Sequence, residues 1–325
     1  MLHKISPVDS GWVRRLCLAF LLVTGSTLGT SARLTGPQHV VDFDGNGRTD
    51  YAVGRLVRGT QIQWLFALNP SGATAALDWG LELDEFVPED YDGDGKTDVA
   101  VWRPGNPGAA AFYILNSLTS TVRVEAFGQT GDDPRVVGDY NGDGRADIAV
   151  FRSGLWSFRT VPNGPTATVA WGTSGDFPAP GDYDGDGKND FVIQRNTGSG
   201  QGAFWRFYSG GGSDVVVFGL PTDLVVPGDY DGDKKTDIVV VRRNTGGPLV
   251  WYRLMSSTGA VHTSAWGLTA SDRPTQGDYD GDGKTDLAIW RSSGVFWVFN
   301  SATQTGTAVP WGTTGDYPIA NFNVH

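Results

Sequence analysis

Cysteine is nearly absent from this 325-residue chain, since its one cysteine, Cys17, lies close to the N-terminus. From about Arg33 onward neither a disulfide framework nor a thiol nucleophile is available. Histidine is scarce as well, and the three histidines beyond the N-terminal segment are His39, His262 and His325. No G-x-S-x-G elbow and no phosphate-binding glycine loop occurs. These absences argue against the common forms of nucleophilic and histidine-based catalysis.

Long apolar runs are missing beyond the N-terminus, which excludes a membrane-spanning helix in the rest of the chain. Residues 1–32 contain a basic region, an apolar core at residues 16–23 and small residues at 30–32. This pattern is typical of a secretory signal peptide. We therefore expect residues 1–32 to be a signal peptide and residues 33–325 to be exported to the periplasm, the cell surface or the medium.

Basic charge is also in short supply. The chain has 25 Lys and Arg against 36 Asp and Glu, for a formal net charge of −11. Without residues 1–32, which carry Lys4, Asp9, Arg14 and Arg15, the net charge becomes −13. Nucleic-acid binding needs a basic surface, so this class of partner is excluded. Of the 36 acidic residues, 22 lie in six short loops, which indicates a local chemical purpose for the acidity.

The clearest of these loops is GDYDGDGKTD, residues 277–286. Counted from Asp278, aspartates stand at positions 1, 3, 5 and 9 and glycines at positions 4 and 6. Glycine permits a tight curl because it adopts positive φ without a Cβ clash. Several carboxylates then face one centre, where a hard cation such as Ca²⁺ takes six to eight oxygen ligands. The pattern overlaps an EF-hand loop but lacks the glutamate at position 12, and an apolar strand follows it in place of a helix.

The loop occurs six times, at intervals of 43 to 49 residues, which is typical of a repeat array or propeller. We expect about six Ca²⁺ ions, held by side chains at positions 1, 3, 5 and 9 and by the backbone carbonyl at position 7. They would largely offset the −13 charge and stabilise a fold without disulfides. The predicted ligands are Asp42, Asp44, Asn46, Arg48, Asp50; Asp90, Asp92, Asp94, Lys96, Asp98; Asp139, Asn141, Asp143, Arg145, Asp147; Asp182, Asp184, Asp186, Lys188, Asp190; Asp229, Asp231, Asp233, Lys235, Asp237; and Asp278, Asp280, Asp282, Lys284, Asp286.

Each repeat reads as four short strands. In the second repeat, the loop leads to strands at residues 99–103, 112–115 and 121–127, and a pre-loop strand at 135–137 enters the next loop. No helical periodicity is present after residue 32. We therefore predict an all-β propeller with a calcium loop in each four-stranded blade. Pre-loop strands at 38–41 and 319–322 give seven for six loops, so six blades are favoured and seven stay open.

Three further residue types recur. An aromatic residue precedes glycine at the end of each third strand: Trp79, Phe127, Trp171, Phe218, Trp266 and Trp311. Aromatic residues also mark the second strand after each loop: Trp64, Tyr113, Trp156, Trp205, Trp251 and Trp297. These either pack between blades, which is favoured, or stack on sugar rings. An arginine stands five residues after each last loop aspartate: Arg55, Arg103, Arg152, Arg195, Arg242 and Arg291.

The recurring arginines either pair with aspartates six residues ahead of a loop or bind an anionic ligand, and pairing is favoured. The expected partners are Asp84, Asp133, Asp176, Asp223 and Asp272. The turn after the first strand varies most between repeats. Residues 104–108 and 196–202 are therefore the expected specificity-bearing loops.

The segments GDYDGDGKTDLAIW, VFGLPTDLVVPGDYDGD and WGTSGDFPAPGDYDGDGKND resemble the FG-GAP/VCBS repeats of secreted bacterial proteins, which are similar to those of integrin α-subunit propellers. The resemblance covers about residue 37 to the C-terminus. It implies a calcium-binding propeller with each ion between the first two strands of a blade. Lys234 departs from the pattern because it occupies position 6, where glycine is expected, and a positive φ there would cost about 1 kcal/mol.

Together these features predict a secreted, monomeric binding or adhesion module for a carbohydrate or another cell-surface ligand. Two other functions stay open. One is a polysaccharide-active, lyase-like enzyme on a propeller scaffold, whose catalytic acids would come from turns outside the calcium loops. The other is a structural scaffold for protein–protein interaction. No catalytic residue is assigned.

Overall fold

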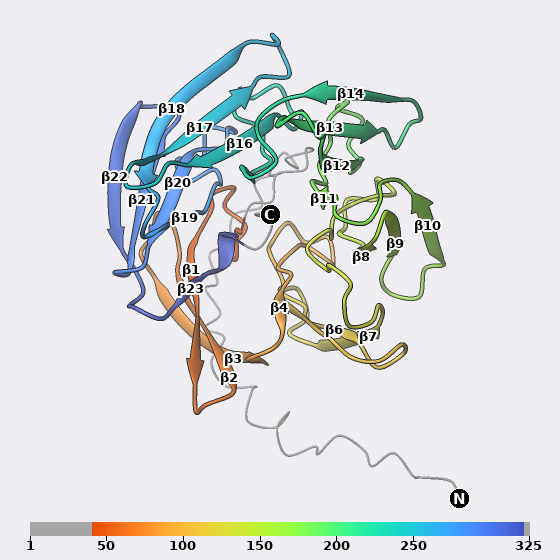
Figure 1. Cartoon of the computed structure of the whole chain (residues 1–325). Helices are drawn as coiled ribbons and strands as arrows, with labels where there is room; N and C mark the ends of the chain where they lie inside the picture. The colour runs from red at the N-terminus through yellow and green to blue at the C-terminus, as the bar shows by residue number, and fades with distance from the viewer. Residues whose placement is uncertain (1–40, 322–325) are drawn as a thin grey trace, which may run out of the picture. The chain divides into compact units, whose positions relative to one another are not determined.

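The structure is a computed structural model that describes residues 41–321. The expected signal peptide, with Cys17, and the start of the expected pre-loop strand at 38–41 lie outside these residues. The described chain folds into six antiparallel sheets arranged around a centre as a six-bladed β-propeller (Figure 1). We number the blades by their loops, so that blades 1 to 6 hold the loops beginning at Asp42, Asp90, Asp139, Asp182, Asp229 and Asp278. Six blades and an all-β fold are therefore confirmed.

In five blades the sheet order is pre-loop strand, then first, second and third strand after the loop, and in blade 3 the sheet consists of the last three of these strands. The pre-loop strands are short and innermost: β4 (Glu85–Phe86), β11 (Phe177–Pro178), β15 (Leu224–Val225), β19 (Asp272–Pro274) and β23 (Tyr317–Pro318). The first strands are β1 (Tyr51–Val57), β5 (Val99–Arg103), β8 (Ile148–Arg152), β12 (Phe191–Asn196), β16 (Ile238–Arg243) and β20 (Leu287–Arg291).

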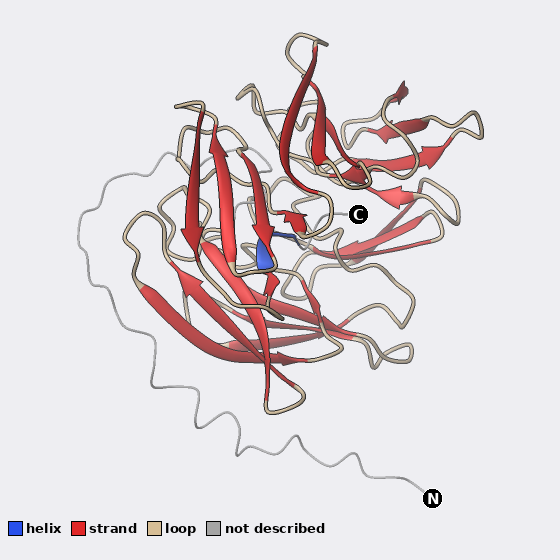
Figure 2. Cartoon of the chain, turned by 60° about the vertical axis from the view of Figure 1, so that its left-hand side comes forward, coloured by secondary structure: helices blue, strands red, loops and turns tan. Residues whose placement is uncertain are grey.

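The remaining strands form the outer half of each blade. The second strands are β2 (Gln61–Ala67), β6 (Ala111–Leu115), β9 (Leu155–Arg159), β13 (Gly202–Phe207), β17 (Pro248–Leu254) and β21 (Val295–Asn300). The third strands, at the rim in Figure 1, are β3 (Thr74–Leu81), β7 (Val122–Ala126), β10 (Thr166–Ala170), β14 (Ser213–Val217), β18 (Val261–Leu268) and β22 (Thr305–Pro310). A 3-10 helix, η2 (Ile319–Asn321), is the one helix that Figure 2 shows among the described residues.

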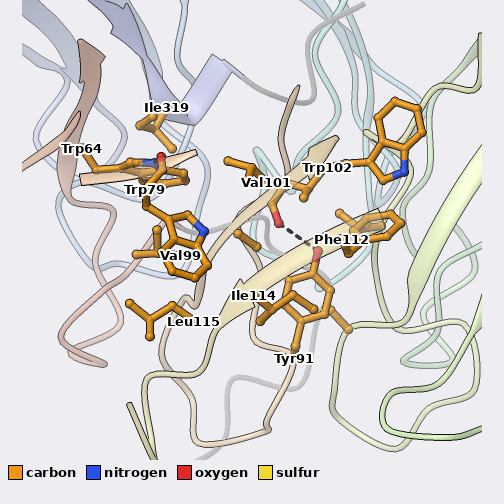
Figure 3. Close-up of a cluster of buried hydrophobic side chains, with 14 of the residues drawn as sticks. Trp64, Trp79, Tyr91, Val99, Val101, Trp102, Phe112, Ile114, Leu115 and Ile319 are labelled. Atoms are coloured by element: carbon orange, nitrogen blue, oxygen red, sulfur yellow. Dashed lines mark hydrogen bonds between the residues drawn. The ribbon is translucent and has the colours of Figure 1, made fainter. Parts of the chain in front are cut away.

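Burial explains why these segments take these places. The first strands are apolar and buried on both faces, as in Val99-Ala100-Val101-Trp102 of β5, because a neighbouring blade covers each face. The third strands are largely exposed, as edge strands are. The hydrophobic clusters lie mainly between adjacent blades. Figure 3 shows the largest cluster, where Trp64 and Trp79 of blade 1 pack near Val99 and Val101 of blade 2.

The ring closes through the last strand. β23 pairs with β1 in the register Val53↔Pro318 and Gly54↔Tyr317, so the end of the chain supplies the innermost strand of blade 1. The prediction that placed this strand at 319–322 is wrong by a few residues, since Ile319–Asn321 forms η2. The expected loop remnant at Asn321-Phe322-Asn323 lies mostly outside the described residues.

Blade 3 departs from the predicted strand pattern. The expected pre-loop strand at 135–137 is absent among the described residues, and a single bridge, Asp133↔Phe151, takes its place beside a three-stranded sheet. One residue more separates Asp132 from its loop than separates the equivalent aspartates from theirs. The bridge at Asp133 is equivalent to the pair Phe177↔Gln194 of blade 4, where pairing continues through Pro178. In blade 3 the extra residue lies beyond this bridge, between it and the loop, and the pairing does not continue.

Candidate metal centres

In blades 2, 4, 5 and 6 the loop joins the innermost strand of the blade to the first strand after it, and in blades 1 and 3 the loop leads into the first strand in the same way. Both ends are pinned, because the residue before position 1 forms a β-bridge with position 9, as in Glu89↔Asp98 and Gly277↔Asp286. The loops therefore lie between the two inner strands of each blade. The N–H groups within each loop point inward at carboxylates, and this pattern recurs from blade to blade.

Position 1 holds the curl of the loop. In blade 2 the Asp90 carboxylate accepts the N–H of Gly93 at 2.6 Å and of Gly95 at 2.8 Å. These glycines have φ of 79° and 84°, which the closed turn requires. The same two bonds recur in the other loops, at Asp42, Asp139, Asp182, Asp229 and Asp278.

Position 9 anchors the loop to its own blade. Asp98 is fully buried and accepts the N–H of Tyr91 at 2.9 Å and of Ser117 at 2.6 Å. Ser117 lies just beyond the second strand, so one carboxylate ties the loop to the far end of the β-hairpin. Equivalent pairs of bonds involve Asp50, Asp190, Asp237 and Asp286. The position-9 aspartates therefore have a structural role besides the ligand role predicted for them.

A serine after the second strand, which was not predicted from the sequence, completes the loop. The Ser117 hydroxyl donates to Asp94 at position 5, at 3.0 Å, while the N–H of Lys96 at position 7 donates to the same carboxylate. Equivalent serine bonds occur at Ser209, Ser256 and Ser301. Three of the four serines stand 19 residues after position 9, a spacing that offered a signal in the sequence.

Position 3 carries the most direct indication of a cation. The Oδ1 atoms of Asp44, Asp92 and Asp280 are buried and have no hydrogen-bond partner among the described residues. A buried carboxylate oxygen without a hydrogen bond lowers the free energy of unfolding by several kcal/mol, because the charged group has lost its hydration and gained no partner. A bound cation removes that penalty. In three of the six loops the structure therefore offers an oxygen for which the protein supplies no donor.

The carboxylates converge in five of the six loops. Ligand atoms from three aspartates lie within 4.8 Å of one another in each of these groups: Asp42, Asp44, Asp50; Asp90, Asp92, Asp94; Asp182, Asp184, Asp190; Asp229, Asp231, Asp237; and Asp278, Asp280, Asp282. All the candidate ligand atoms are hard oxygen atoms, which suits Ca²⁺ and excludes the softer metals that prefer sulfur or imidazole. The loop beginning at Asp139 forms no such group among the described residues.

Electrostatics make these clusters unfavourable without positive charge. Burial, with further repulsion from neighbouring aspartates, raises the pKa of Asp98, Asp190 and Asp286 to about 7. The same causes raise the pKa of Asp90 and Asp278 to about 6. A divalent cation among these groups favours their charged form and reverses the shift. The residues therefore fit a hard divalent cation.

Adjacent loops are joined to one another around the ring. The N–H at position 8 of each loop donates to the carbonyl at position 1 of the loop before it. The six bonds, each of 2.6 to 2.8 Å, are Thr97 to Asp42, Ala146 to Asp90, Asn189 to Asp139, Thr236 to Asp182, Thr285 to Asp229, and Thr49 to Asp278. The last of these joins the first loop to the sixth. The six loops thus form one continuous annulus of backbone hydrogen bonds.

The position-7 side chains reinforce the annulus. Each lies against the position-4 glycine of the preceding loop, so that a Cβ added to Gly45 would lie 3.0 Å from Lys96 and one added to Gly281 would lie 2.9 Å from Arg48. The side chains of Arg145, Lys188, Lys235 and Lys284 take the same place on Gly93, Gly142, Gly185 and Gly232. Position 4 therefore needs glycine for two reasons, its positive φ and this neighbour.

The recurring arginines lie at the other end of the first strands, away from the loops. Arg103, Arg195, Arg242 and Arg291 each bind an aspartate through two nitrogens, as predicted, at Asp84, Asp176, Asp223 and Asp272. The prediction that Arg152 pairs with Asp133 is wrong. Arg152 contacts Asp132 at 3.2 Å, and Asp133 binds Arg135, because this segment contains one extra residue. Asp316 supplies the sixth partner, for Arg55.

The second-strand aromatics divide into two sets. Trp64, Trp156 and Trp251 are buried, and each donates its indole N–H to the carbonyl of the aromatic residue before glycine in its own blade. Packing is therefore confirmed for these three. Tyr113, Trp205 and Trp297 are half-buried, and a guanidinium covers one face of each ring, from Arg103, Arg195 and Arg291 at 4.4, 4.9 and 5.3 Å from the ring centroid. That covered face is closed to a stacking sugar.

The aromatic-glycine pairs join blade to blade. The indole N–H of Trp79 donates to the carbonyl of Tyr113 in the next blade at 3.2 Å, and Trp171, Trp266 and Trp311 make equivalent bonds to Trp205, Trp297 and Leu65. Among the described residues His262 is the one histidine, and it lies exposed on β18. No helix within residues 41–321 has the length and apolar character needed to cross a membrane.

Comparison with known proteins agrees with this architecture. A family model described as FG-GAP-like repeat matches residues 90–150 and 182–240. Each matched segment begins at one loop, runs through the next loop and ends within the strand that follows, so the two contain four of the six loops. A comparison with curated proteins finds no match.

One solved structure shows likeness at the level of fold. A crystal structure of TolB from Acinetobacter baumannii is 16% identical in sequence, aligns over 82% of this chain and has a TM-score of 0.56. This chain spans 64% of the TolB chain. A structure of the mitotic checkpoint complex aligns over 90% of this chain and 91% of its own, with 14% identity and a TM-score of 0.42. Residues 90–150 and 182–240 thus match the FG-GAP-like repeat, the family that the sequence resembles, within a six-bladed propeller.

Proposed function

We propose that this protein is an exported, calcium-stabilised propeller that binds a carbohydrate at a cell surface. A propeller of FG-GAP-like repeats supports an interaction module in general. The observation that carries the proposal is the contrast between the two ends of the first strands. At one end six loops repeat the same hydrogen bonds, and at the other end the turns differ in length.

The end of the first strands that carries the six loops has a structural role in this proposal. Five groups of converging carboxylates and the unpartnered oxygens of Asp44, Asp92 and Asp280 support calcium binding there. Because the loops also hold adjacent blades together, Ca²⁺ bound in them stabilises the ring itself. The metal is accordingly proposed as structural, and the ligand is expected elsewhere.

The opposite end, where the turns between the first and second strands differ, is proposed to bind the ligand. The turn between the first and second strands has two residues in blade 3 (Ser153-Gly154), seven in blade 2 (residues 104–110) and five in blade 4 (residues 197–201). Turns that differ in length on a rigid scaffold are the usual place for specificity. The arginine–aspartate pairs of the same end place polar groups beside these turns, which suits hydrogen bonding to the hydroxyl groups of a sugar.

A glycan array probed with the calcium-loaded protein tests this proposal. We expect binding to one family of glycans, and loss of that binding when residues 197–201 are replaced by a Ser-Gly turn like that of blade 3. The same replacement at residues 244–247 of blade 5 is the matched control, and melting curves check that both variants fold. Release of unsaturated sugar products would instead favour the lyase-like enzyme, and capture of a protein partner without glycan binding would favour a scaffold.

A further inference from the structure

We propose that the loop of blade 3 holds no cation, and that the side-chain amide of Asn141 fills the site in its place. The protein would then bind five Ca²⁺ ions. This inference depends on the proposed calcium binding by the other five loops. It rests on the hydrogen bonds of Asn141 and on the turn that faces it.

The orientation of the Asn141 amide is fixed by its partners. Its Oδ1 accepts the N–H of Asp143 at 2.8 Å, and its Nδ2 donates to the Asp147 carboxylate at 3.2 Å and to the Thr160 hydroxyl at 2.6 Å. A backbone N–H can only donate and a carboxylate only accepts. Reversing the amide would set two donors against each other and two oxygens against each other. The amide nitrogen therefore points into the loop, where the other loops present a position-3 carboxylate oxygen.

The Asn141 amide also replaces a backbone N–H that binds the position-9 carboxylate in other blades. In blade 2 the position-9 carboxylate accepts the N–H of Ser117, and in blade 3 the equivalent oxygen of Asp147 accepts the Asn141 amide. A cation at this position would have to displace the amide from both Asp147 and Thr160. The loop is thus closed by hydrogen bonds alone.

The turn after the second strand, which faces this loop, also differs from its equivalents in other blades. By the strand register, Val161 of blade 3 stands where Ser117, Ser209, Ser256 and Ser301 stand in blades 2, 4, 5 and 6. Valine has no hydroxyl to hold the position-5 carboxylate, and Val161 is buried in the apolar cluster. Two separate positions of blade 3 therefore depart from the pattern that the loops of blades 2, 4, 5 and 6 share.

The loop of blade 1 shows that an asparagine alone does not remove a site. Asn46 stands at position 5, its Oδ1 accepts the N–H of Arg48 at 2.9 Å, and its amide donates to the carbonyl of Asn69 at 2.6 Å. The amide nitrogen thus has a partner in the facing turn, and Asp42, Asp44 and Asp50 still converge. Asn46 at position 5 is therefore compatible with a cation site, whereas Asn141 at position 3 turns its amide nitrogen toward Asp147 and Thr160.

Calcium stoichiometry tests the inference without any assay of ligand binding. Equilibrium dialysis of the purified, folded protein with Ca²⁺, followed by elemental analysis, should give five ions per chain. Asn141→Asp, alone or with Val161→Ser, should raise the count to six. Asn46→Asp is the matched control and should leave it at five. Circular dichroism checks the fold of each variant.

The outcomes separate the two proposals. Six ions in the unmodified protein, or no gain in either Asn141 variant, would overturn the inference while leaving calcium binding intact. A protein that binds no Ca²⁺ would overturn calcium binding and the inference with it. Five ions, rising to six with an Asn141 variant and unchanged in the control, would support both.

Discussion

Lys234 stands at loop position 6, where the other five loops have glycine, and its φ is 70°. Its N–H donates to Asp229 at 2.8 Å, the bond that glycine makes elsewhere. A Cβ added to Gly95, Gly187 or Gly283 would meet no heavy atom within 4 Å, so a side chain at position 6 has room. The disadvantage of Lys234 is therefore confined to its left-handed backbone.

Replacing Lys234 with glycine should raise the free energy of unfolding by up to about 1 kcal/mol, because glycine adopts positive φ without strain. The reciprocal change Gly187→Lys should lower it by a similar amount. Calorimetric melting of both variants in excess Ca²⁺ measures the difference. A lysine at position 187 with no loss of stability would show that the backbone there is not strained.

At this scale the sequence predicted what depends on spacing within one loop. Aspartates of these loops converge in five of the six because the glycines between them permit the positive φ that the curl requires. Partners that come from other strands were harder to predict. Ser117 and its equivalents come from the far end of the hairpin, and Asp132 replaced Asp133 because a single inserted residue shifted the alignment.

At the scale of the strands, the buried indole comes from the second strand in some blades and from the first strand in others. Trp64, Trp156 and Trp251 oppose Gly54, Phe151 and Val241 on the first strands of blades 1, 3 and 5. In blades 2 and 6 the arrangement is reversed, since Phe112 and Phe296 oppose Trp102 and Trp290. Either strand can thus supply the indole whose N–H binds the carbonyl of the aromatic residue before glycine.

The same substitution should therefore have different effects in adjacent blades. Trp156→Phe removes a buried indole and its 2.9 Å bond to the carbonyl of Trp171, and should lower the free energy of unfolding by about 2 kcal/mol. Trp205→Phe should lower it by less than about 1 kcal/mol, because that ring is half-buried and its N–H has no partner among the described residues. Urea unfolding of the pair measures both values. Equal losses would contradict the division into two sets.

The first, second and third strands were predictable to within a residue or two in the second repeat, since burial between blades imposes apolar runs and exposure at the rim imposes alternation. The pre-loop strands were not. They contain two or three residues, several end in proline, and their place depends on pairing with a strand beyond the loop. The register that separates the two sets of aromatics is likewise set by pairing across strands.

For the whole molecule, pH and calcium should act in opposition. Burial raises the pKa of Asp98, Asp190 and Asp286 to about 7, against about 4 in an unfolded chain. Between pH 4 and 7 the metal-free folded protein therefore holds more protons than the unfolded chain. Its free energy of unfolding falls as pH rises through this range.

Calcium competes with those protons, so its stabilising effect should grow as pH rises from 5 to 8. At a hundredfold excess over Kd each occupied site adds about 2.7 kcal/mol. Melting curves in EDTA and in Ca²⁺ at pH 5, 6, 7 and 8 measure the gap, which should widen steadily. A gap independent of pH, or melting unaffected by EDTA, would show that these carboxylates do not hold the ion.

The annulus of loops makes no distinction between joints that follow one another along the chain and the joint between Thr49 and Asp278. All six have the same backbone donor and acceptor and are covered by a lysine or an arginine, although the last joins residues that are far apart in the sequence. The hydrogen bonds of the annulus therefore do not depend on where the chain begins. A circular permutation that opens the polypeptide between any other two blades would keep every contact of the annulus, so a rearranged order of the repeats would leave the closed ring of six blades unchanged.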